Sequence, residues 1–223
     1  VPALLVVAAS QSRKAILMIP LGIIILLFLK NLGNRSFFKS FFRIVLSLAL
    51  FAAVLVLISR ISIFRGVNER LTSMIASFTG EGAADGSSLL RKKMREVGFA
   101  QFLKTPIFGI GIGCSDVLLQ HTINRSTYLH NNYIELLACG GIVGTALYYV
   151  PRLALLRDFW SSRFLRNRQA IACLTILLLL LIMDYGAVAY SEKMQYLYLL
   201  MLFVQADKLR ESNHQTLEDG ADE

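Results

Sequence analysis

The segment TPIFGIGIGCSDVLLQHTINRSTYLHNNYIELLACGGIVG, residues Thr105–Gly144, decides the fold of this chain. It begins with a proline and three alternating glycines, Gly109, Gly111 and Gly113. It continues through polar sequence to His130 and then becomes apolar. A glycine-rich turn and a histidine therefore precede a hydrophobic helix. We interpret this arrangement as a reaction centre at a membrane surface.

The composition is that of a membrane protein. Hydrophobic residues make up 55% of the 223 residues, and they gather in runs flanked by lysine and arginine, as is typical of helices that cross a bilayer. The formal net charge is +8, but basic residues at the ends of apolar runs serve membrane topology, so we expect no nucleic-acid partner. The three cysteines lack metal-ligand spacing and predict neither a metal site nor a disulfide framework.

The apolar runs predict an all-α fold, a polytopic bundle of transmembrane helices. The chain begins inside a partial first span, and we expect further spans to precede it in a longer protein. The predicted complete spans are residues 15–29, 41–58, 131–153, 170–190 and 194–206. Residues 1–58 and 130–206 therefore form two membrane regions. Residues 207–223 are predicted to be a disordered polar tail in the cytoplasm.

The long segment between the two membrane regions, residues 59–129, is predicted to lie outside the cytoplasm. A polar stretch, residues 80–88, interrupts it, and a helix follows over residues 89–103. This helix has apolar residues at helical spacing and a basic face, which suits a position on the membrane surface. Pro106 ends it, and the glycines that follow allow the backbone to approach a neighbour closely.

The basic residues predict how the chain is oriented in the membrane. Two short loops, residues 30–43 and 152–168, carry the basic excess, and the spans between them place both loops in the cytoplasm. The segment 59–129 is then extracytoplasmic. Arg13 falls on the same outer side as His130.

His130 is the candidate catalytic base. A neutral imidazole suits removal of a proton from a sugar hydroxyl near neutral pH. The side chains of Asn131 and Asn132 can fix a ring tautomer or an acceptor hydroxyl, and the preceding glycine turn makes room for a ligand. The alternative is an interfacial, helix-capping histidine without a chemical role. Glu135 either orients the imidazole or is only an interfacial charge.

Arg13 and Arg91 are the candidate phosphate ligands. Two guanidinium groups on the outer face can clamp a diphosphate bidentately, as lysine cannot, and lipid-borne phosphates lie at this depth. The alternative for Arg13 is that it only flanks a span and extends its charged group to the membrane surface. The alternative for Arg91 is that it is one of several basic residues exposed to solvent. Asp184 is either functional or paired locally. The turn at Gly109–Gly113 lacks the spacing of a nucleotide-binding loop, so no nucleotide cofactor is predicted.

Four motifs follow one another in the chain. They are S-x-S-R-x-A at residues 10–15, S-x-x-R at 88–91, P-x-F-G-x-G-x-G at 106–113 and H-N-N-Y-x-E-x-L-x-x-x-G-x-x-G at 130–144. In this order they resemble the O-antigen ligase and O-antigen polymerase family of bacterial membrane proteins. The resemblance extends over nearly the whole chain, which corresponds to the C-terminal half of a typical member.

The resemblance implies a GT-C-like membrane fold and glycosyl transfer without metal or cofactor. The implied site lies on the extracytoplasmic face of the bacterial inner membrane, and the implied donor is a glycan on undecaprenyl pyrophosphate. His130 would deprotonate the acceptor hydroxyl, and Arg13 and Arg91 would hold the pyrophosphate, with Arg95 as the alternative to Arg91. Pyrophosphate leaves readily once its charge is stabilised. The expected partners are the bilayer and a chain-length regulator or flippase of the same pathway.

The most specific function that we predict is polymerisation of lipid-linked repeat units by inverting transfer. The product would be an O-antigen, capsule or exopolysaccharide, because the two asparagines after His130 resemble such polymerases. The first alternative is a ligase that transfers the glycan to a lipid A-core acceptor. The second is a transporter or flippase component. Discontinuous helices or charged residues at mid-span depth would favour this function. The third is a purely structural membrane subunit.

Overall fold

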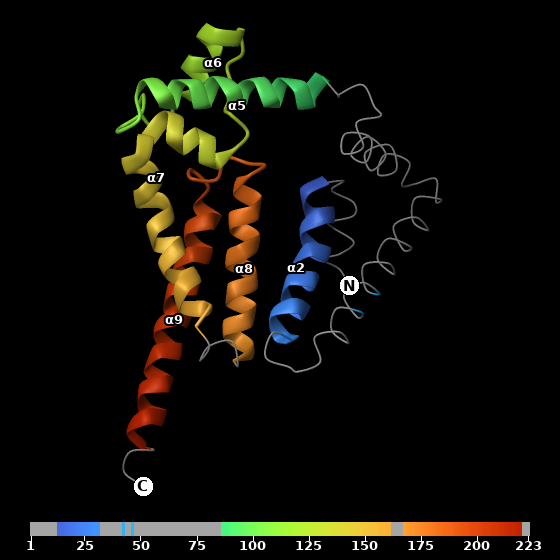
Figure 1. The fold of residues 1–223 in the computed structure, drawn as a ribbon, viewed down its shortest axis with the longest axis vertical. Helices are drawn as coiled ribbons and strands as arrows, with labels where there is room; N and C mark the ends of the chain where they lie inside the picture. Colours follow the sequence, from blue (N-terminus) through green and yellow to red (C-terminus); the bar gives the residue numbers. More distant parts are fainter. Residues whose placement is uncertain (1–12, 32–41, 43–45, 47–85, 162–166, 220–223) are drawn as a thin grey trace. The chain divides into compact units, whose positions relative to one another are not determined.

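The computed structural model describes residues 13–31, 42, 46, 86–161 and 167–219. These residues are helical or lie in connecting loops, and no strand occurs among them. The helices are α2 (Arg13–Asn31), α5 (Gly86–Lys104), α6 (Ser115–Ile123), α7 (Asn132–Phe159), α8 (Arg168–Asp184) and α9 (Lys193–Asp219) (Figure 1). The chain divides into two compact units after Leu89, with α2 in the first and most of α5 and all later helices in the second.

The helix α2 is the described element of the first unit. It runs from Arg13 to Asn31, where a helix is predicted over residues 15–29, and Lys30 stands in its last turn. A basic residue at this end complements the helix dipole. Pro20 lies inside the helix without ending it. The predicted span 41–58 and most of the segment up to residue 85 lie outside the described residues.

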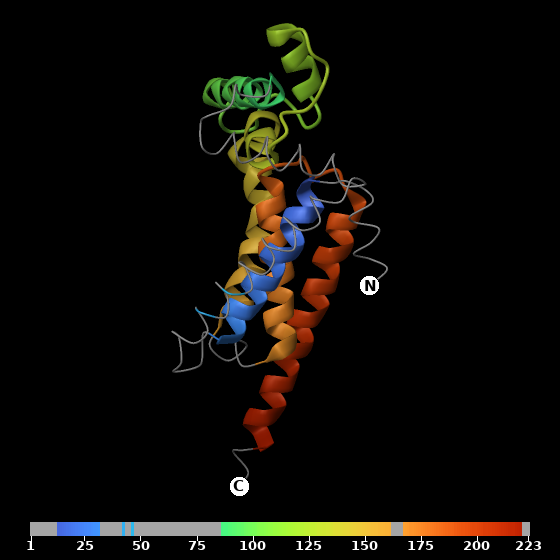
Figure 2. The same ribbon diagram turned by 90° about the vertical axis from the view of Figure 1, so that its right-hand side faces the viewer.

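Three helices form the bundle of the second unit. The helices α7, α8 and α9 pack against one another and run side by side in both views (Figures 1 and 2). Each contributes fully buried apolar side chains, such as Leu155 of α7, Leu174 of α8 and Ala206 of α9. Within a bilayer such side chains hold helices together by close van der Waals packing, because lipid is as apolar as leucine and burial removes little surface from water.

In the described part of the chain, α7 is the helix that is long and apolar enough to cross a membrane. Its 28 residues exceed the roughly 20 that a bilayer requires, because the helix continues beyond the predicted end of the span to Phe159. Arg152, which the sequence places in a cytoplasmic loop, is buried, and its guanidinium carbon lies 3.5 Å from the ring centroid of Tyr148. The helical fold class is thus confirmed for the described residues, and the number of spans stays a prediction.

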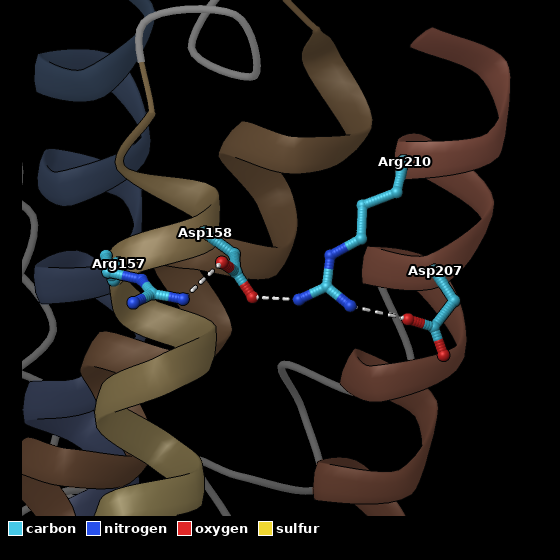
Figure 3. Close-up of polar contacts among 4 residues, drawn as sticks. All are labelled: Arg157, Asp158, Asp207 and Arg210. Carbon is cyan, nitrogen blue, oxygen red and sulfur yellow. Dashed lines mark hydrogen bonds and ion pairs between the residues drawn. The ribbon is translucent and has the colours of Figure 1, made fainter. Parts of the chain in front are cut away.

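The structure has the polar tail in a helix as far as Asp219, whereas the sequence predicts disorder there. Arg210 of α9 pairs with Asp158 at the end of α7 and with Asp207, at 2.9 Å, one turn earlier on α9 (Figure 3). Arg157 also lies 3.7 Å from Asp158. The extension of α9 is therefore tied to α7 by an ion-pair network.

The helix α5 has nearly the bounds of the predicted amphipathic helix, but its apolar face packs against protein. Leu90, Met94 and Val97 join a core cluster with residues of α6 and α7. At Gly98 the helix comes so close that an added Cβ would lie 2.6 Å from the side chain of Leu129. The helix α5 is thereby fixed across the end of the bundle at which α7 begins (Figure 1).

Candidate functional site

The helix α7 is broken at Gly141, whose φ of 62° and ψ of −162° lie outside the helical region. In a continuous helix the carbonyl oxygens of Ala138 and Cys139 would accept from the N–H groups of Ile142 and Val143. The break removes both bonds. Four backbone groups inside an apolar helix then need other partners, because an unpaired buried peptide group is costly.

The glycine-rich segment 105–113 supplies all four partners from its own backbone. Its N–H groups bond the freed carbonyl oxygens, and its carbonyl oxygens bond the freed N–H groups. The bonds are Ile110 to Ala138 (3.1 Å), Gly111 to Cys139 (2.9 Å), Ile142 to Pro106 (2.8 Å) and Val143 to Ile107 (3.2 Å). The segment therefore supplies partners to all four of these backbone groups.

Two of the glycines are required by this contact. Gly109 has a φ of +68°, and a Cβ on it would lie 2.4 Å from the backbone of Cys139. Gly141 has a φ of +62°, and a Cβ on it would lie 2.3 Å from the carbonyl oxygen of Ile107. The space that the sequence assigns to a ligand at Gly109 is occupied by α7. Around Gly113 there is open space.

His130 lies immediately before the cap of α7, in a left-handed backbone conformation with a φ of +57°. Such a conformation is uncommon outside glycine and is held by the surrounding structure. The imidazole is half-buried, and its centroid lies 4.2 Å from that of the Tyr128 ring. The structure thus presents His130 at the start of the candidate span with its ring partly accessible.

Asn131 is the N-cap of α7. Its side-chain oxygen accepts a hydrogen bond from the backbone N–H of Ile134 at 3.0 Å, which satisfies a free donor of the first turn. Its amide nitrogen donates to the carbonyl oxygen of Tyr185 at 3.1 Å. Asn131 therefore joins the start of α7 to the end of α8, next to His130.

Asn132 uses all four of its side-chain hydrogen-bonding positions within the protein. Its nitrogen donates to the Tyr149 hydroxyl at 3.1 Å and to Asp184 Oδ2 at 3.3 Å. Its oxygen accepts from the backbone N–H groups of Ala189 at 2.8 Å and Tyr190 at 3.1 Å. An asparagine offers two donors and two acceptor positions, so these four described bonds occupy the side chain that was expected to serve the imidazole or an acceptor hydroxyl. Asn132 instead positions the backbone that carries His130.

Glu135 is almost fully buried, with 1% of its surface exposed. Its carboxylate accepts hydrogen bonds from the Ser115 hydroxyl of α6 and from the backbone N–H of Leu129, the latter at 2.8 Å. The second bond fixes the residue that precedes His130. Glu135 thus anchors the loop before the imidazole to the first turn of α7.

The candidate arginines lie in different settings. Arg95 is half-buried, and its guanidinium carbon lies 5.8 Å from the ring centroid of Tyr185, which also contacts Asn131. Arg91 is exposed one turn earlier on α5. Arg13 begins α2 in the first unit. Of these three arginines, Arg95 is the one whose described contacts reach the end of the bundle that holds His130.

The interior of the bundle holds polar residues that the sequence pattern does not place there. Tyr149 donates to Asp184 Oδ2 at 3.0 Å, and Arg152 donates to the carbonyl oxygen of Tyr148. Asp184 is visible in the sequence as an acid near the end of an apolar run. Arg152 is not, because it stands where a basic loop is expected to begin. Among the described residues, four buried polar atoms have no hydrogen-bond partner: the Tyr148 hydroxyl, Arg152 Nη2, Asp184 Oδ1 and Gln195 Oε1.

A pocket of about 360 Å³ lies between the start of α6, the loop before His130 and the connection from α8 to α9. Tyr128 lines it, and the same ring packs on the His130 imidazole. Glu135 and Tyr190 also line it. No sequence pattern predicts this pocket, because its walls come from four separate segments, including Glu135 of α7.

Over the described residues these features define an all-helical protein with a histidine at the head of a broken apolar helix that is long enough to cross a membrane. The chain matches the model of the O-antigen ligase family over residues 1–149, a region that ends within α7 and contains His130. The chain belongs to this family, whose members are glycosyltransferase-like membrane enzymes that act on lipid-linked glycans. Neither the comparison with curated proteins nor that with solved structures gives a match.

Proposed function

We propose that this protein joins oligosaccharide repeat units carried on undecaprenyl pyrophosphate into a surface polysaccharide, with His130 as the base. The observation that carries the proposal is the setting of His130. It stands between a packed tyrosine and a capped helix, in a strained backbone conformation held by Asn131 and Asn132. A side chain held so firmly and still partly accessible suits proton transfer at a defined point.

In the proposed reaction an acceptor hydroxyl oxygen attacks the anomeric carbon of the donor. His130 takes the hydroxyl proton as the new C–O bond forms. The bond from the anomeric carbon to the pyrophosphate oxygen breaks, and undecaprenyl pyrophosphate leaves with the electron pair. Attack opposite to the leaving group inverts the anomeric configuration. Neither metal nor cofactor is needed, provided that cationic groups stabilise the charge that develops on the pyrophosphate.

The guanidinium groups of Arg13 and of Arg91 or Arg95 are the proposed pyrophosphate ligands. Arg91 and Arg95 are one turn apart on α5, so they are neighbours on the helix surface. The contact of Arg95 with Tyr185 favours Arg95 for a role near His130, and the exposure of Arg91 leaves its guanidinium available to a ligand. The site would lie on the extracytoplasmic face of a multi-pass protein in the inner membrane.

Transport of a lipid-linked glycan is the competing function, and the broken α7 with charges buried in the bundle is the feature that would argue for it. In transporters the freed backbone groups at such a break coordinate ions or substrate. Here the segment 105–113 already occupies all four groups at Gly141. This observation favours a rigid catalytic scaffold over a transport site. Ligation to a lipid A-core acceptor uses the same chemistry and differs only in the acceptor.

The test is substitution of His130 in the full-length protein, produced in a bacterium that lacks its own copy. His130→Ala is expected to insert into the membrane at the normal level and to abolish long-chain polysaccharide on gels. Gln101→Ala on the half-buried face of α5 serves as the matched control and retains normal chains. Normal chain lengths in His130→Ala would exclude the role as base.

A second readout separates polymerase from ligase. A polymerase variant without activity leaves single repeat units attached to the lipid A-core, because ligation continues. A ligase variant without activity leaves undecaprenyl-linked polymer and an unmodified lipid A-core. The arginines are tested by Arg13→Lys, Arg91→Lys and Arg95→Lys, which keep the charge but lose the bidentate fork. Wild-type output from all three would remove the proposed clamp.

A further inference from the structure

The pocket beside Tyr128 has a lining unlike that of an anion site. Three carboxylates and several hydroxyl groups share its wall, and none of the described residues that line it is basic. The carboxylates are those of Asp116, Glu135 and Glu192, and the hydroxyl groups that we expect to set its specificity are those of Thr127, Tyr128 and Tyr190. The volume of about 360 Å³ falls within the range of about 300–1,000 Å³ that is usual for small-molecule sites.

The charges of this pocket exclude the donor's pyrophosphate as its occupant. Three carboxylates would repel a diphosphate, and the described wall offers no guanidinium or ammonium group to offset them. A resident metal ion is not indicated either. Over the ranges that the structure describes, no group of three or more histidine, cysteine, aspartate or glutamate side chains is arranged to hold a metal. The remaining ligands are neutral or cationic molecules rich in hydrogen-bond donors.

The polar groups are arranged to accept such donors. The Glu135 carboxylate is fixed from one side by Ser115 and Leu129, and each oxygen keeps a further acceptor position. Asp116 Oδ1 receives the N–H of Val117 at 2.7 Å, which orients this second carboxylate. Sugar hydroxyls are donors that suit these oxygens, and the face of Tyr128 offers an apolar surface for a sugar ring.

Tyr190 completes this wall as an uncharged hydroxyl in the connection between α8 and α9. The ordinary pKa of a tyrosine hydroxyl is about 10, so the hydroxyl of Tyr190 keeps its proton at physiological pH. Its backbone N–H is bound by Asn132, so the residue is positioned by the same side chain that supports the head of α7. Hydrogen bonds of Asn132 thus connect the wall of the pocket to the start of α7, which follows His130.

We infer that this pocket binds an uncharged or amino-bearing sugar of the glycosyl acceptor and discriminates against sugars that carry a carboxylate. The identification of the bound glycan as the acceptor rests on the proposed function. The contact of the Tyr128 ring with the imidazole, at 4.2 Å between centroids, places the pocket one side chain away from His130. A glycan anchored there by one sugar presents the hydroxyl of an adjoining sugar to His130, while the phosphates remain on the basic side of α5.

Binding is measured directly on the full-length protein in nanodiscs by isothermal titration. The probe is the repeat-unit oligosaccharide that mild acid releases from the lipid-linked pool of the bacterium that makes the protein. A second probe is the same oligosaccharide after oxidation of its primary alcohols to carboxylates. The oxidised probe is expected to bind at least about tenfold more weakly, because it brings like charges together.

Two substitutions change the hydrogen-bonding groups of the wall with little change in its shape: Glu192→Gln removes a negative charge, and Tyr190→Phe removes a hydroxyl. The double variant Glu192→Gln with Tyr190→Phe is expected to raise the Kd of the untreated probe about tenfold, because a charged acceptor and a hydroxyl group of the wall are lost together. Glu192→Gln alone is expected to reduce the discrimination against the oxidised probe. Glu96→Gln, which removes an equal charge from an exposed position of α5 outside the pocket, is the matched control and binds as the unsubstituted protein does.

Unchanged affinity in the double variant, or equal binding of the two probes, would overturn the inference. Transfer activity of His130→Ala, measured in parallel, keeps the two proposals distinguishable. If His130→Ala loses transfer activity but still binds the probe, the result supports both the role of His130 as base and the assignment of the pocket. Normal transfer in His130→Ala removes the role as base but leaves the measured discrimination of the pocket standing.

Discussion

Gly111 donates its backbone N–H to the carbonyl oxygen of Cys139 over 2.9 Å, in place of the helical partner that Cys139 lacks. The bond joins the turn after α5 to the first third of the candidate span α7. The break at Gly141 and the glycine-rich segment 105–113 therefore form one structural unit. That unit sets the direction of the first turns of α7, and these turns begin directly after His130.

The first prediction concerns the glycines of this unit. Gly141→Ala and Gly109→Ala each force an alanine to a positive φ, at about 1–3 kcal/mol, and also drive a Cβ into backbone that cannot yield. We expect each variant to lower the free energy of unfolding by more than about 3 kcal/mol. The thermal midpoint of the detergent-solubilised protein should fall by at least about 6 °C.

Two other glycines provide graded controls. Gly113→Ala meets open space but has a φ of +83°, so only the backbone strain should remain. Gly186→Ala meets open space, has no positive φ, and should change the midpoint little. If Gly109→Ala were as stable as Gly113→Ala, the close contact with Cys139 would not exist in the protein.

The second prediction separates the two asparagines. Asn131→Ala loses a helix cap and the bond to Tyr185, and should cost about 1–2 kcal/mol. Asn132→Ala removes four hydrogen bonds and leaves Tyr149 and Asp184 partly unpaired in the bundle, and should cost about 3–5 kcal/mol. Chemical denaturation of the solubilised protein measures both. Equal costs would contradict the assignment of Asn132 as the central connection.

The third prediction concerns the helical extension of α9. Arg210→Gln breaks the pair with Asp158, whose side chain is 14% exposed, and should speed amide exchange of residues 207–212 several-fold. The effect stays small because the arginine side chain is 49% exposed. Arg157→Gln, at a side chain 82% exposed, should leave exchange unchanged. Unaltered exchange in both variants would show that packing alone holds this segment.

The fourth prediction tests the orientation in the membrane. The helix α6 and the start of α8 lie at opposite ends of the candidate span α7, and each carries an exposed residue, His121 and Arg168 (Figure 1). His121→Cys should react with a membrane-impermeant maleimide on intact cells whose outer membrane is permeable to it. Arg168→Cys should react only after the inner membrane is opened. The reverse pattern would place His130 in the cytoplasm and end the proposed reaction, because the predicted donor glycan is outside.

Much of the helical framework follows from local sequence. The apolar run after His130 predicts α7, because a single stretch of this length and hydropathy pairs its own peptide groups in a bilayer by forming a helix. Asn131 and Asn132 precede that run, and Asn131 forms the cap of the helix. The helix α5 is marked by its apolar spacing, and Leu90, Met94 and Val97 do face inward. What that spacing does not reveal is whether the apolar face meets lipid or protein.

Arg152 explains why α7 extends beyond the span that the sequence predicts. Charge counting assigns any arginine after an apolar run to a loop, since an exposed charge leaves the bilayer. The tertiary structure instead gives this guanidinium an aromatic face and a backbone carbonyl, both from Tyr148. Partners one turn away on the same helix remove part of the cost of burial, and the helix continues to Phe159. A hydropathy average over the sequence contains no information on whether a buried arginine finds a partner.

By itself the sequence determined that the chain is helical, that it carries membrane-spanning character, and that His130 heads an apolar helix. These are local properties, because hydropathy, helix capping and glycine content act within a few residues. Only the tertiary structure decided that α7 breaks at Gly141, that the glycine turn fills the break, and that Asn132 joins three segments. The pocket beside Tyr128 belongs to the same category. These features depend on which distant backbone groups come within hydrogen-bonding distance, and packing of the whole unit sets that distance.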